Sequence, residues 1–362
     1  MNIYIPLSLF LIILCYTTRN NRKQCRTCFF ISMTVLFIFA ALRYNFGADY
    51  TSYLADFKES KVHGADSHYE IEFIFGRYLV LFPKYIYFIA FTSLLWFSSL
   101  YYLFKTNVPY KYYWLLLMYL CFTEECIIHG LVAIRSALAM VVFVWSMYFV
   151  TMDRRLIALG LLISNVFIHL ASFIFIPLIL LNKKSRDLFT SKVFLLTIII
   201  ASVCLIFLGK NYFLVMMQTF LADNVEEMAK YNQYAQEVSG VGSLLVAFGS
   251  KFLTLIPLYY LYIGAKIETD KQFIIFYQIG ILSLCVTLLL GTGMTSRILM
   301  VLNPFFIISM IRFINYLSIK HTTVAFLCVM FFSLYSLYNS MQADYNVSFK
   351  EYHSIIGVPN LP

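Results

Sequence analysis

The sequence predicts an all-α protein that crosses a membrane many times, and three observations lead to this prediction. The 362 residues are 61% hydrophobic and 19% aromatic. Only 12% are charged, whereas a soluble domain carries roughly 25% charged residues. Apolar runs of about 20 residues, the length that spans a bilayer, recur along the whole chain. Because backbone polar groups in lipid must be bonded internally, such runs form helices, and a soluble enzyme domain is excluded.

The apolar runs predict about ten full transmembrane helices in a single integral-membrane domain that covers 1–362. The first run is followed by a basic loop and a second apolar run, so we interpret it as a span and not as a cleaved signal peptide. The predicted spans are 3–18, 27–43, 85–104, 112–128, 130–150, 193–208, 245–264, 273–290, 297–316 and 323–339.

The apolar segment 156–181 is predicted to form a two-helix hairpin that enters the membrane and returns. Arg154 and Arg155 precede it, and Lys183 and Lys184 follow it. Basic residues in short loops mark the cytoplasmic side, so both ends of the segment are expected there. A single crossing is the alternative, but it would reverse the basic bias of the later loops.

The distribution of charge orients the remaining helices. Four basic residues lie between the first two spans, which places that loop inside and the N-terminus outside. With the hairpin in place, the inner loops are strongly basic and the outer segments slightly acidic. The net charge of +9 is therefore explained by membrane orientation, and no nucleic-acid partner is predicted.

Two long segments, 44–84 and 209–244, are predicted to be outer-face loops with amphipathic helices. The first contains "NFGADYTSYLADF" and "YEIEFIFGRYLVLF", of which the latter is too charged to cross and is expected in the interface plane. Most of the aromatic residues are explained as an interfacial belt. A few could stack on sugar rings, and the candidate glycan contacts are Tyr50, Tyr53, Tyr231 and Tyr234.

Four polar side chains from separate segments are expected at one depth near the outer side. Arg43 ends the second span, Arg297 opens another, and His169 lies at the midpoint of the hairpin. Arg135 lies about five residues, roughly 8 Å, below the outer start of its span. Taken singly, Arg43 and Arg297 could reach the interface with long side chains, and His169 could be a hydrogen-bonded core residue.

Arg135 is the least expected of the four, because a charge at the centre of a membrane helix costs at least about 2.5–3.5 kcal/mol. Glu124 or Glu125, at the outer end of the preceding span, could form a salt bridge with it. A phosphate group is the other candidate partner, since arginine offers a planar fork that matches phosphate oxygens. "GTGMTSR", which ends at Arg297, also puts glycines and hydroxyls at a helix N-terminus, where an anion is favoured. These features predict an outward-facing site for a phosphorylated lipid.

Three stretches resemble the EpsG family: "LRYNFGADYTSYLADF", "IRSALAMVVFVWSMYFV" and "RRLIALGLLISNVFIHLASFIFIPLILL". The resemblance covers roughly 40–315 as sparse positions. EpsG-type proteins belong with the Wzy-like polymerases of bacterial surface polysaccharides. The resemblance implies an O-antigen, capsule or exopolysaccharide polymerase in the bacterial inner membrane, with a periplasmic active site.

The resemblance also implies a reaction. Such enzymes transfer a growing glycan from undecaprenyl diphosphate onto a new lipid-linked repeat unit, so both donor and acceptor are lipid-linked oligosaccharides. They are metal-independent glycosyltransferases without a cofactor, and a chain-length regulator in the membrane is the expected partner. In keeping with this, we find no clustered Asp-x-Asp, and "DNVEE" is interpreted as a solvated helix face.

The site residues can be assigned roles on this basis. Arg43, Arg135 and Arg297 would bind the diphosphate, and Arg135 would also stabilise the charge that develops as the glycosidic bond breaks. A base for the acceptor hydroxyl is still needed, and a histidine suits this role at neutral pH. The candidate bases are His169, Asp49 and Glu124 or Glu125. The pattern does not choose among them, nor between an inverting and a retaining outcome.

Three other functions stay open. An O-antigen ligase would use much the same donor site. A lipid-linked oligosaccharide flippase is less favoured, because the chain has no internal repeat and its polar groups gather on one side instead of at the midplane. A membrane acyltransferase would need acyl-donor access from the cytoplasm, where the predicted loops are short and simply basic.

Overall fold

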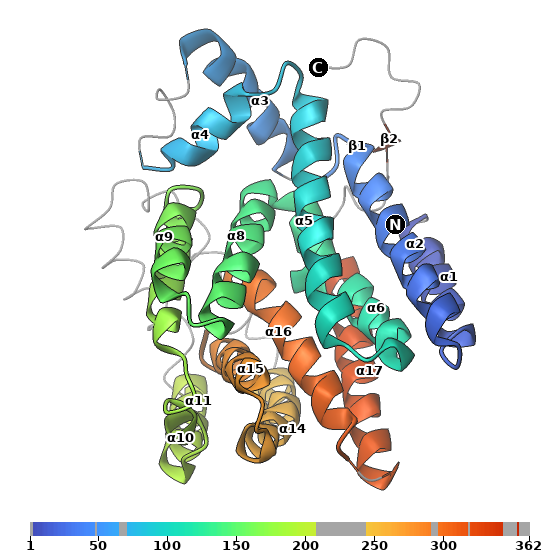
Figure 1. Cartoon of the computed structure of the whole chain (residues 1–362), viewed down its shortest axis with the longest axis vertical. Helices are drawn as coiled ribbons and strands as arrows, with labels where there is room; N and C mark the ends of the chain where they lie inside the picture. The colour runs from blue at the N-terminus through green and yellow to red at the C-terminus, as the bar shows by residue number, and fades with distance from the viewer. Residues whose placement is uncertain are drawn as a thin grey trace.

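The computed structural model describes residues 3–47, 49–64, 71–207, 244–290, 296–317, 319–342 and 353–354, and this part of the chain is almost entirely helical (Figure 1). The chain begins with α1 (Tyr4–Thr17) and α2 (Arg22–Ala41), which pack against each other. A short strand, β1 (Arg43–Tyr44), then pairs antiparallel with β2 (His353–Ser354). The pairing brings residues near the end of the chain to the start of the first predicted outer segment.

Two helices of that segment lie together at one end of the helix bundle (Figure 1). They are α3 (Tyr50–His63) and α4 (Phe73–Val80), and the long helix α5 (Tyr85–Asn107) begins at the same end. Buried aromatic rings from α3, α4 and α5 join the start of α8 in a separate apolar cluster. This cluster fixes the first outer segment on the end of the bundle.

The next part of the chain is a broken helix. It comprises η1 (Tyr110–Tyr112), α6 (Tyr113–Phe122), η2 (Glu124–Ile128), α7 (His129–Val132) and α8 (Ile134–Thr151). The two parts on either side of residues 123–125 bend by 48°. Cys126 (φ −107°, ψ −109°) and Ala133 (φ −92°, ψ 79°) leave the helical conformation. Of the two spans predicted here, 130–150 corresponds to α8 apart from its start, whereas 112–128 is interrupted at residues 123–125.

The segment predicted as a hairpin folds as two arms that pack along each other. The first arm is α9 (Arg155–Val166), and the second, η3 (Leu170–Leu180), is a 3-10 helix and not the α-helix that was expected. His169 lies at the turn between them. Short helices α10 (Arg186–Phe189) and α11 (Lys192–Phe207) follow, at the end of the molecule away from α3 and α4 (Figure 1).

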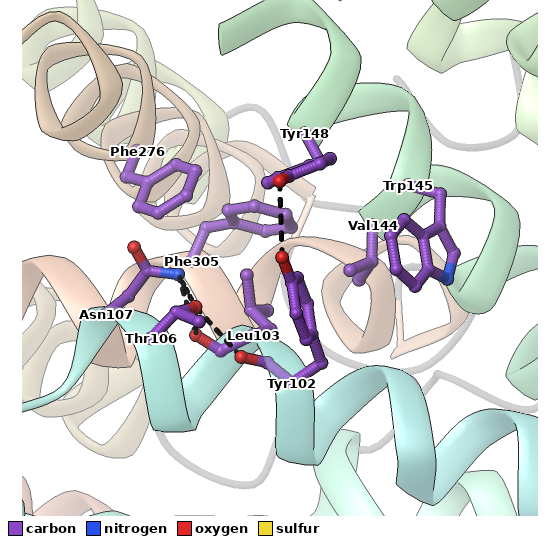
Figure 2. A pocket seen from close by; sticks show the side chains of 9 residues that line it. All are labelled: Tyr102, Leu103, Thr106, Asn107, Val144, Trp145, Tyr148, Phe276 and Phe305. Carbon is purple, nitrogen blue, oxygen red and sulfur yellow. Dashed lines mark hydrogen bonds between the residues drawn. The ribbon is translucent and has the colours of Figure 1, made fainter. Parts of the chain in front are cut away.

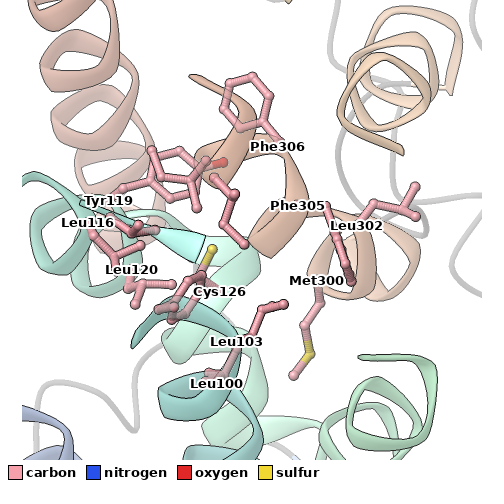
Figure 3. Close-up of a cluster of buried hydrophobic side chains, with 14 of the residues drawn as sticks. Leu100, Leu103, Leu116, Tyr119, Leu120, Cys126, Met300, Leu302, Phe305 and Phe306 are labelled. Atoms are coloured by element: carbon pink, nitrogen blue, oxygen red, sulfur yellow. The ribbon is translucent and has the colours of Figure 1, made fainter. Parts of the chain in front are cut away.

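The last described helices gather around α16. They are α14 (Leu244–Ile267), α15 (Lys271–Leu290), α16 (Ser296–Ile314) and α17 (Ile319–Gln342). Helix α16 packs against α8, α14, α15 and α17 and is buried along most of its length. Figure 3 shows the apolar side chains that fill the space between α16, α5, α6 and η2, including Tyr119, Cys126 and Phe305.

Within the described residues, five helices are long and apolar enough to cross a membrane: α2, α5, α8, α15 and α16. A sixth span results if the bent pair of residues 110–122 and 126–132 counts as one. An all-α, multi-pass membrane protein is therefore confirmed. The number of about ten full spans stays a prediction, since several predicted spans form shorter apolar helices such as α1, with 14 residues. The second predicted outer loop, 209–244, lies outside the described residues except for its last position.

Candidate functional site

A cluster of charged and polar side chains lies at the α3–α4 end of the bundle, and Glu72 is at its centre. Glu72 is buried just before α4. Its Oε1 accepts a hydrogen bond from the backbone N–H of Leu170 (2.7 Å) and lies 3.2 Å from Nδ1 of His169. Its Oε2 forms an ion pair with Nη1 of Arg135. One carboxylate thus joins the tip of the hairpin to the start of α8.

Arg135 occupies the first turn of α8, because the helix begins at Ile134. The predicted depth of five residues below the outer start of a span is therefore wrong, and the break at Ala133 is the reason. The guanidinium Nε donates to the hydroxyl of Tyr53 (3.3 Å), and the group lies 5.5 Å from the Tyr53 ring and 5.7 Å from the Phe75 ring. Aromatic faces attract a cation at such distances.

Arg297 has the same position on a second helix, in the first turn of α16. Its Nη2 lies 3.7 Å from Oδ2 of Asp49, in the loop before α3. Its charge also acts on His129 and His169, which places it beside the Glu72 group of residues. Helix α16 packs against both α7 and α8, so the two arginines belong to one site.

Both arginines stand where a positive charge is unfavourable. The first turn of a helix carries the positive end of the dipole and backbone N–H groups without a helical acceptor. Neither α8 nor α16 has an acidic residue in its first turn. Glu72 and Asp49, from another part of the chain, supply the negative charge. Such an arrangement binds anions, since each helix start and each arginine attracts the same charge.

Glu72 is ionised at neutral pH. Burial alone would raise its pKa, but the hydrogen bond from His169 and the positive charge of Arg135 lower the pKa of Glu72 to about 2. An ionised carboxylate can only accept hydrogen bonds. The proton of a neutral His169 ring is therefore assigned to Nδ1, which leaves Nε2 with a free lone pair. Nε2 is buried and has no hydrogen-bond partner within the described residues.

Arg43, Tyr50 and Tyr53 were also predicted as site residues, and all three are buried. The Arg43 side chain is buried at 2% exposure and donates from Nη1 to the Ala40 carbonyl (2.6 Å) and to Oγ of Ser93 (3.2 Å). It therefore ties α2 to α5 beneath the site. Tyr50 and Tyr53 are also buried, with their rings packed among other aromatic side chains, so their contact with a glycan stays a prediction.

Three predicted site residues cannot be placed in the cluster. Tyr231 and Tyr234 lie outside the described residues. Glu124 begins η2, but its side chain is also outside them. The partner of Arg135 in the structure is Glu72, which sequence analysis treated only as a charge that keeps its segment out of the bilayer.

Sequence analysis missed both Glu72 and His129 as site residues. Glu72 lies 63 positions before Arg135, and no helical spacing relates a carboxylate in a loop to a distant arginine. The available signal was a glutamate placed directly between the apolar residues Ile71 and Phe73. His129 lies between the predicted spans 112–128 and 130–150 and was read only as part of a short connection, and its buried Nε2 also has no hydrogen-bond partner within the described residues.

The loop that carries Asp49 depends on a glycine. Gly47 has φ +91°, and a Cβ at this position would lie 3.0 Å from Cγ2 and 3.1 Å from Cα of Val132. Asn45, two residues before Gly47, also has a positive φ, 45°. Glycine adopts such conformations without the steric cost that a side chain brings. The glycine in "NFGADY" therefore lets the loop lie directly on α7 and brings Asp49 to Arg297.

Two further features of the described residues bear on the chemistry. No group of three or more His, Cys, Asp or Glu side chains there could hold a metal ion. A small pocket lies between α5, α8, α15 and α16 (Figure 2), at the end opposite to α3 and α4. Its lining is aromatic and aliphatic with Thr106 and Asn107, and it has no charged side chain. The charged cluster around Glu72 is therefore the candidate site.

The fold and the site define a multi-pass α-helical membrane protein with arginines, carboxylates and histidines gathered at one end of its bundle. Among known families, the EpsG family matches residues 26–354. The chain therefore belongs to the EpsG family, a family of Wzy-type polysaccharide polymerases, and the resemblance noted in the sequence is confirmed. No curated protein matches the chain, and no solved structure does.

Proposed function

We propose that this chain polymerises undecaprenyl-diphosphate-linked oligosaccharide repeat units at the periplasmic face of the bacterial inner membrane. Family membership supports a polysaccharide polymerase. The observation that carries the proposal further is the pair of arginines at the starts of two adjacent helices, each held by a carboxylate from elsewhere in the chain. A lipid diphosphate carries the charge and the oxygen atoms that such a site binds.

Arg135 and Arg297 are the residues we propose for the diphosphate. Their side chains are 21% and 22% exposed, whereas Arg43 is only 2% exposed. Arg43 would then support the site from beneath, without touching the diphosphate. In the empty site Glu72 and Asp49 balance the two positive charges, and the incoming diphosphate would compete with them. The arginines also provide the positive charge that would otherwise be expected from a metal ion.

The reaction would form a bond between an acceptor hydroxyl oxygen and the anomeric carbon of the donor sugar. The bond from that carbon to the diphosphate oxygen breaks, and the diphosphate leaves with the electron pair. Arginines aimed at this oxygen stabilise the developing charge, and a single well-placed donor is worth about 3–4 kcal/mol. Lipid diphosphate is a good leaving group, so a general acid is dispensable. The hydroxyl proton passes to a base, whether the outcome is inverting or retaining.

We favour His169 as this base. Its Nε2 has a free lone pair, and imidazole accepts protons near neutral pH. Asp49 is engaged with Arg297 at 3.7 Å, so its carboxylate is less available to a substrate hydroxyl. Glu124 stays a candidate from its position in the chain. A membrane protein that regulates chain length is the expected partner.

The proposal is tested by surface polysaccharide gels from a strain that lacks the gene and carries plasmid-borne variants at equal protein levels. The deletion should leave a single repeat unit on the lipid anchor or on lipid A. Arg135→Ala and Arg297→Ala should reproduce this pattern. Arg77→Ala, in an exposed arginine of α4 at the same end of the bundle, should restore the full ladder and serves as the control.

Other outcomes would contradict the assignment. Long ladders from Arg135→Ala would exclude this arginine from the reaction. A deletion strain without any repeat unit on lipid A would indicate a ligase or a flippase in place of a polymerase, and a flux assay with lipid-linked substrate would separate these two.

A further inference from the structure

We infer that Glu72 is a positioning residue, which holds His169 in the tautomer and orientation of a general base and links it to the diphosphate-binding Arg135. The inference rests on the proposed function and deepens it by adding a residue that sequence analysis did not assign. It predicts that Glu72 acts on the reaction through His169.

The geometry around Glu72 leaves the carboxylate little freedom. Oε1 receives the Leu170 N–H at 2.7 Å and lies 3.2 Å from Nδ1 of His169, while Oε2 pairs with Arg135. Both oxygens are therefore occupied, and a rotation of the carboxylate would break contacts on two other elements.

Backbone hydrogen bonds hold the same two segments together. The N–H groups of Ile74 and Phe75, in the first turn of α4, both donate to the carbonyl of Phe167 (3.2 and 3.4 Å). Phe167 and His169 belong to the turn of the hairpin between α9 and η3. The start of α4 is thus attached to the hairpin tip next to the Glu72–His169 contact, which limits how far the two side chains can move apart.

The surrounding charges explain why a base at this place needs a carboxylate. Burial disfavours a positive charge on the His169 ring most strongly, and Arg135 on α8 and Arg297 on α16 add to this effect. His129 on α7 is a further titratable neighbour. The Glu72 carboxylate, hydrogen-bonded to Nδ1, opposes the two arginines and allows the imidazole to accept a proton.

The proton transfer can be written in full. The acceptor hydroxyl donates a hydrogen bond to Nε2 of His169, an atom without a hydrogen-bond partner among the residues that the structure describes. As the hydroxyl oxygen bonds to the anomeric carbon, its proton moves to Nε2, and the departing diphosphate keeps the electrons of the broken bond. Glu72 remains ionised and stabilises the imidazolium, which later releases the proton to water. A carboxylate that orients a histidine and stabilises its charged form has the same role in acid–base triads.

The test uses the purified full-length protein in lipid nanodiscs with lipid-linked repeat units, and measures turnover between pH 5.5 and 8.5. Glu72→Gln should lower turnover by about 100-fold, the lower end of what a positioned base contributes. The acidic limb of its rate–pH profile should move to lower pH, since the amide no longer stabilises the protonated ring. Glu72→Asp should retain more activity and an acidic limb near that of the wild type. Glu59→Gln, which removes an exposed carboxylate from α3, is the matched control and should match the wild type.

A double variant separates positioning from a general effect on folding. If Glu72 acts through His169, then Glu72→Gln combined with His169→Gln should be no slower than His169→Gln alone. Multiplicative losses, or a Glu72→Gln variant with the wild-type rate and profile, would overturn the inference while leaving the polymerase assignment intact. Should Glu72→Gln not fold, the same comparison with Glu72→Asp decides. A wild-type protein that makes no polymer would instead refute the proposed function.

Discussion

Gly47 offers a direct test of how the loop before α3 is built, because three glycines in the chain separate the relevant effects. Gly47 and Gly64 have nearly the same backbone angle, φ +91° and +88°. A Cβ at Gly47 would meet Val132 at 3.0–3.2 Å, whereas a Cβ at Gly64 meets nothing within 4 Å. Gly160, on helix α9, has no positive φ and no atom within 4 Å of its added Cβ.

The expected cost of each alanine substitution follows from these contacts. Gly64→Ala adds only backbone strain, because φ 88° with ψ 167° lies in a region essentially confined to glycine, at a cost of about 1–3 kcal/mol. Gly47→Ala combines the strain of a positive φ, about 1–3 kcal/mol, with overpacking against Val132, about 1–3 kcal/mol, for a total of roughly 2–6 kcal/mol. Gly160→Ala should be neutral or stabilising by about 0.5–1 kcal/mol, because alanine suits a helix interior better than glycine. From the most to the least stable protein, the order should be Gly160→Ala, wild type, Gly64→Ala and Gly47→Ala.

The assay is denaturation of the purified proteins in detergent, followed by tryptophan fluorescence, together with the polysaccharide gel. Gly47→Ala should also shorten the polymer, since the loop that it displaces carries Asp49 to Arg297. The double variant Gly47→Ala/Val132→Ala should recover part of the stability, because it removes the Cγ2 atom at 3.0 Å. Equal stabilities for Gly47→Ala and Gly64→Ala would refute the proposed contact with Val132.

Three further predictions concern the charged cluster. Arg135→Lys keeps the charge but loses the planar fork and the Nε bond to Tyr53, so turnover should fall at least tenfold without loss of folded protein, as measured in nanodiscs. The lowered pKa of Glu72, about 2 against 4.5, stabilises the fold by about 3 kcal/mol above pH 4.5. This stability is lost as the pH falls from about 4.5 to about 2, so melting curves should depend less on pH in Glu72→Gln. Asp49→Asn should cost less than about 1 kcal/mol of stability, because its ion pair with Arg297 is partly exposed, but diphosphate binding measured by calorimetry should change.

The long helices of the bundle could be predicted from hydropathy because each is a local property of the sequence. Helix α15 (Lys271–Leu290) was predicted as 273–290, and α16 (Ser296–Ile314) as 297–316. The break around Cys126 and Ala133 could not be predicted in this way. The break includes Thr123, Glu124 and Glu125, but the apolar runs on either side are long enough to be read as spans, and only the fold shows that the break packs against Trp96 and α16.

The site could be predicted only in part, because some of its residues stand out in the local sequence and others do not. Arg135, His169 and Arg297 stand out as polar residues in apolar runs, and the structure brings all three together with Asp49. Glu72 did not stand out, since a carboxylate in a polar loop is ordinary until tertiary contacts bury it. A lone charge in lipid therefore indicates that a partner exists, but only the fold identifies that partner.

Helix α8 begins at Ile134, four residues later than the predicted span, and this has a consequence for how a lipid substrate reaches the site. The helix has 18 residues, which at 1.5 Å each gives about 27 Å, slightly less than the ~30 Å thickness of the hydrocarbon layer. If α8 spans this layer, its first turn lies near the boundary where phosphate headgroups lie. Under the proposed function, a polyprenyl donor would then reach Arg135 by lateral diffusion, with its diphosphate at its usual depth and its chain still in the bilayer. Substrate capture would in that case require no work to lift the lipid or to bury its charge.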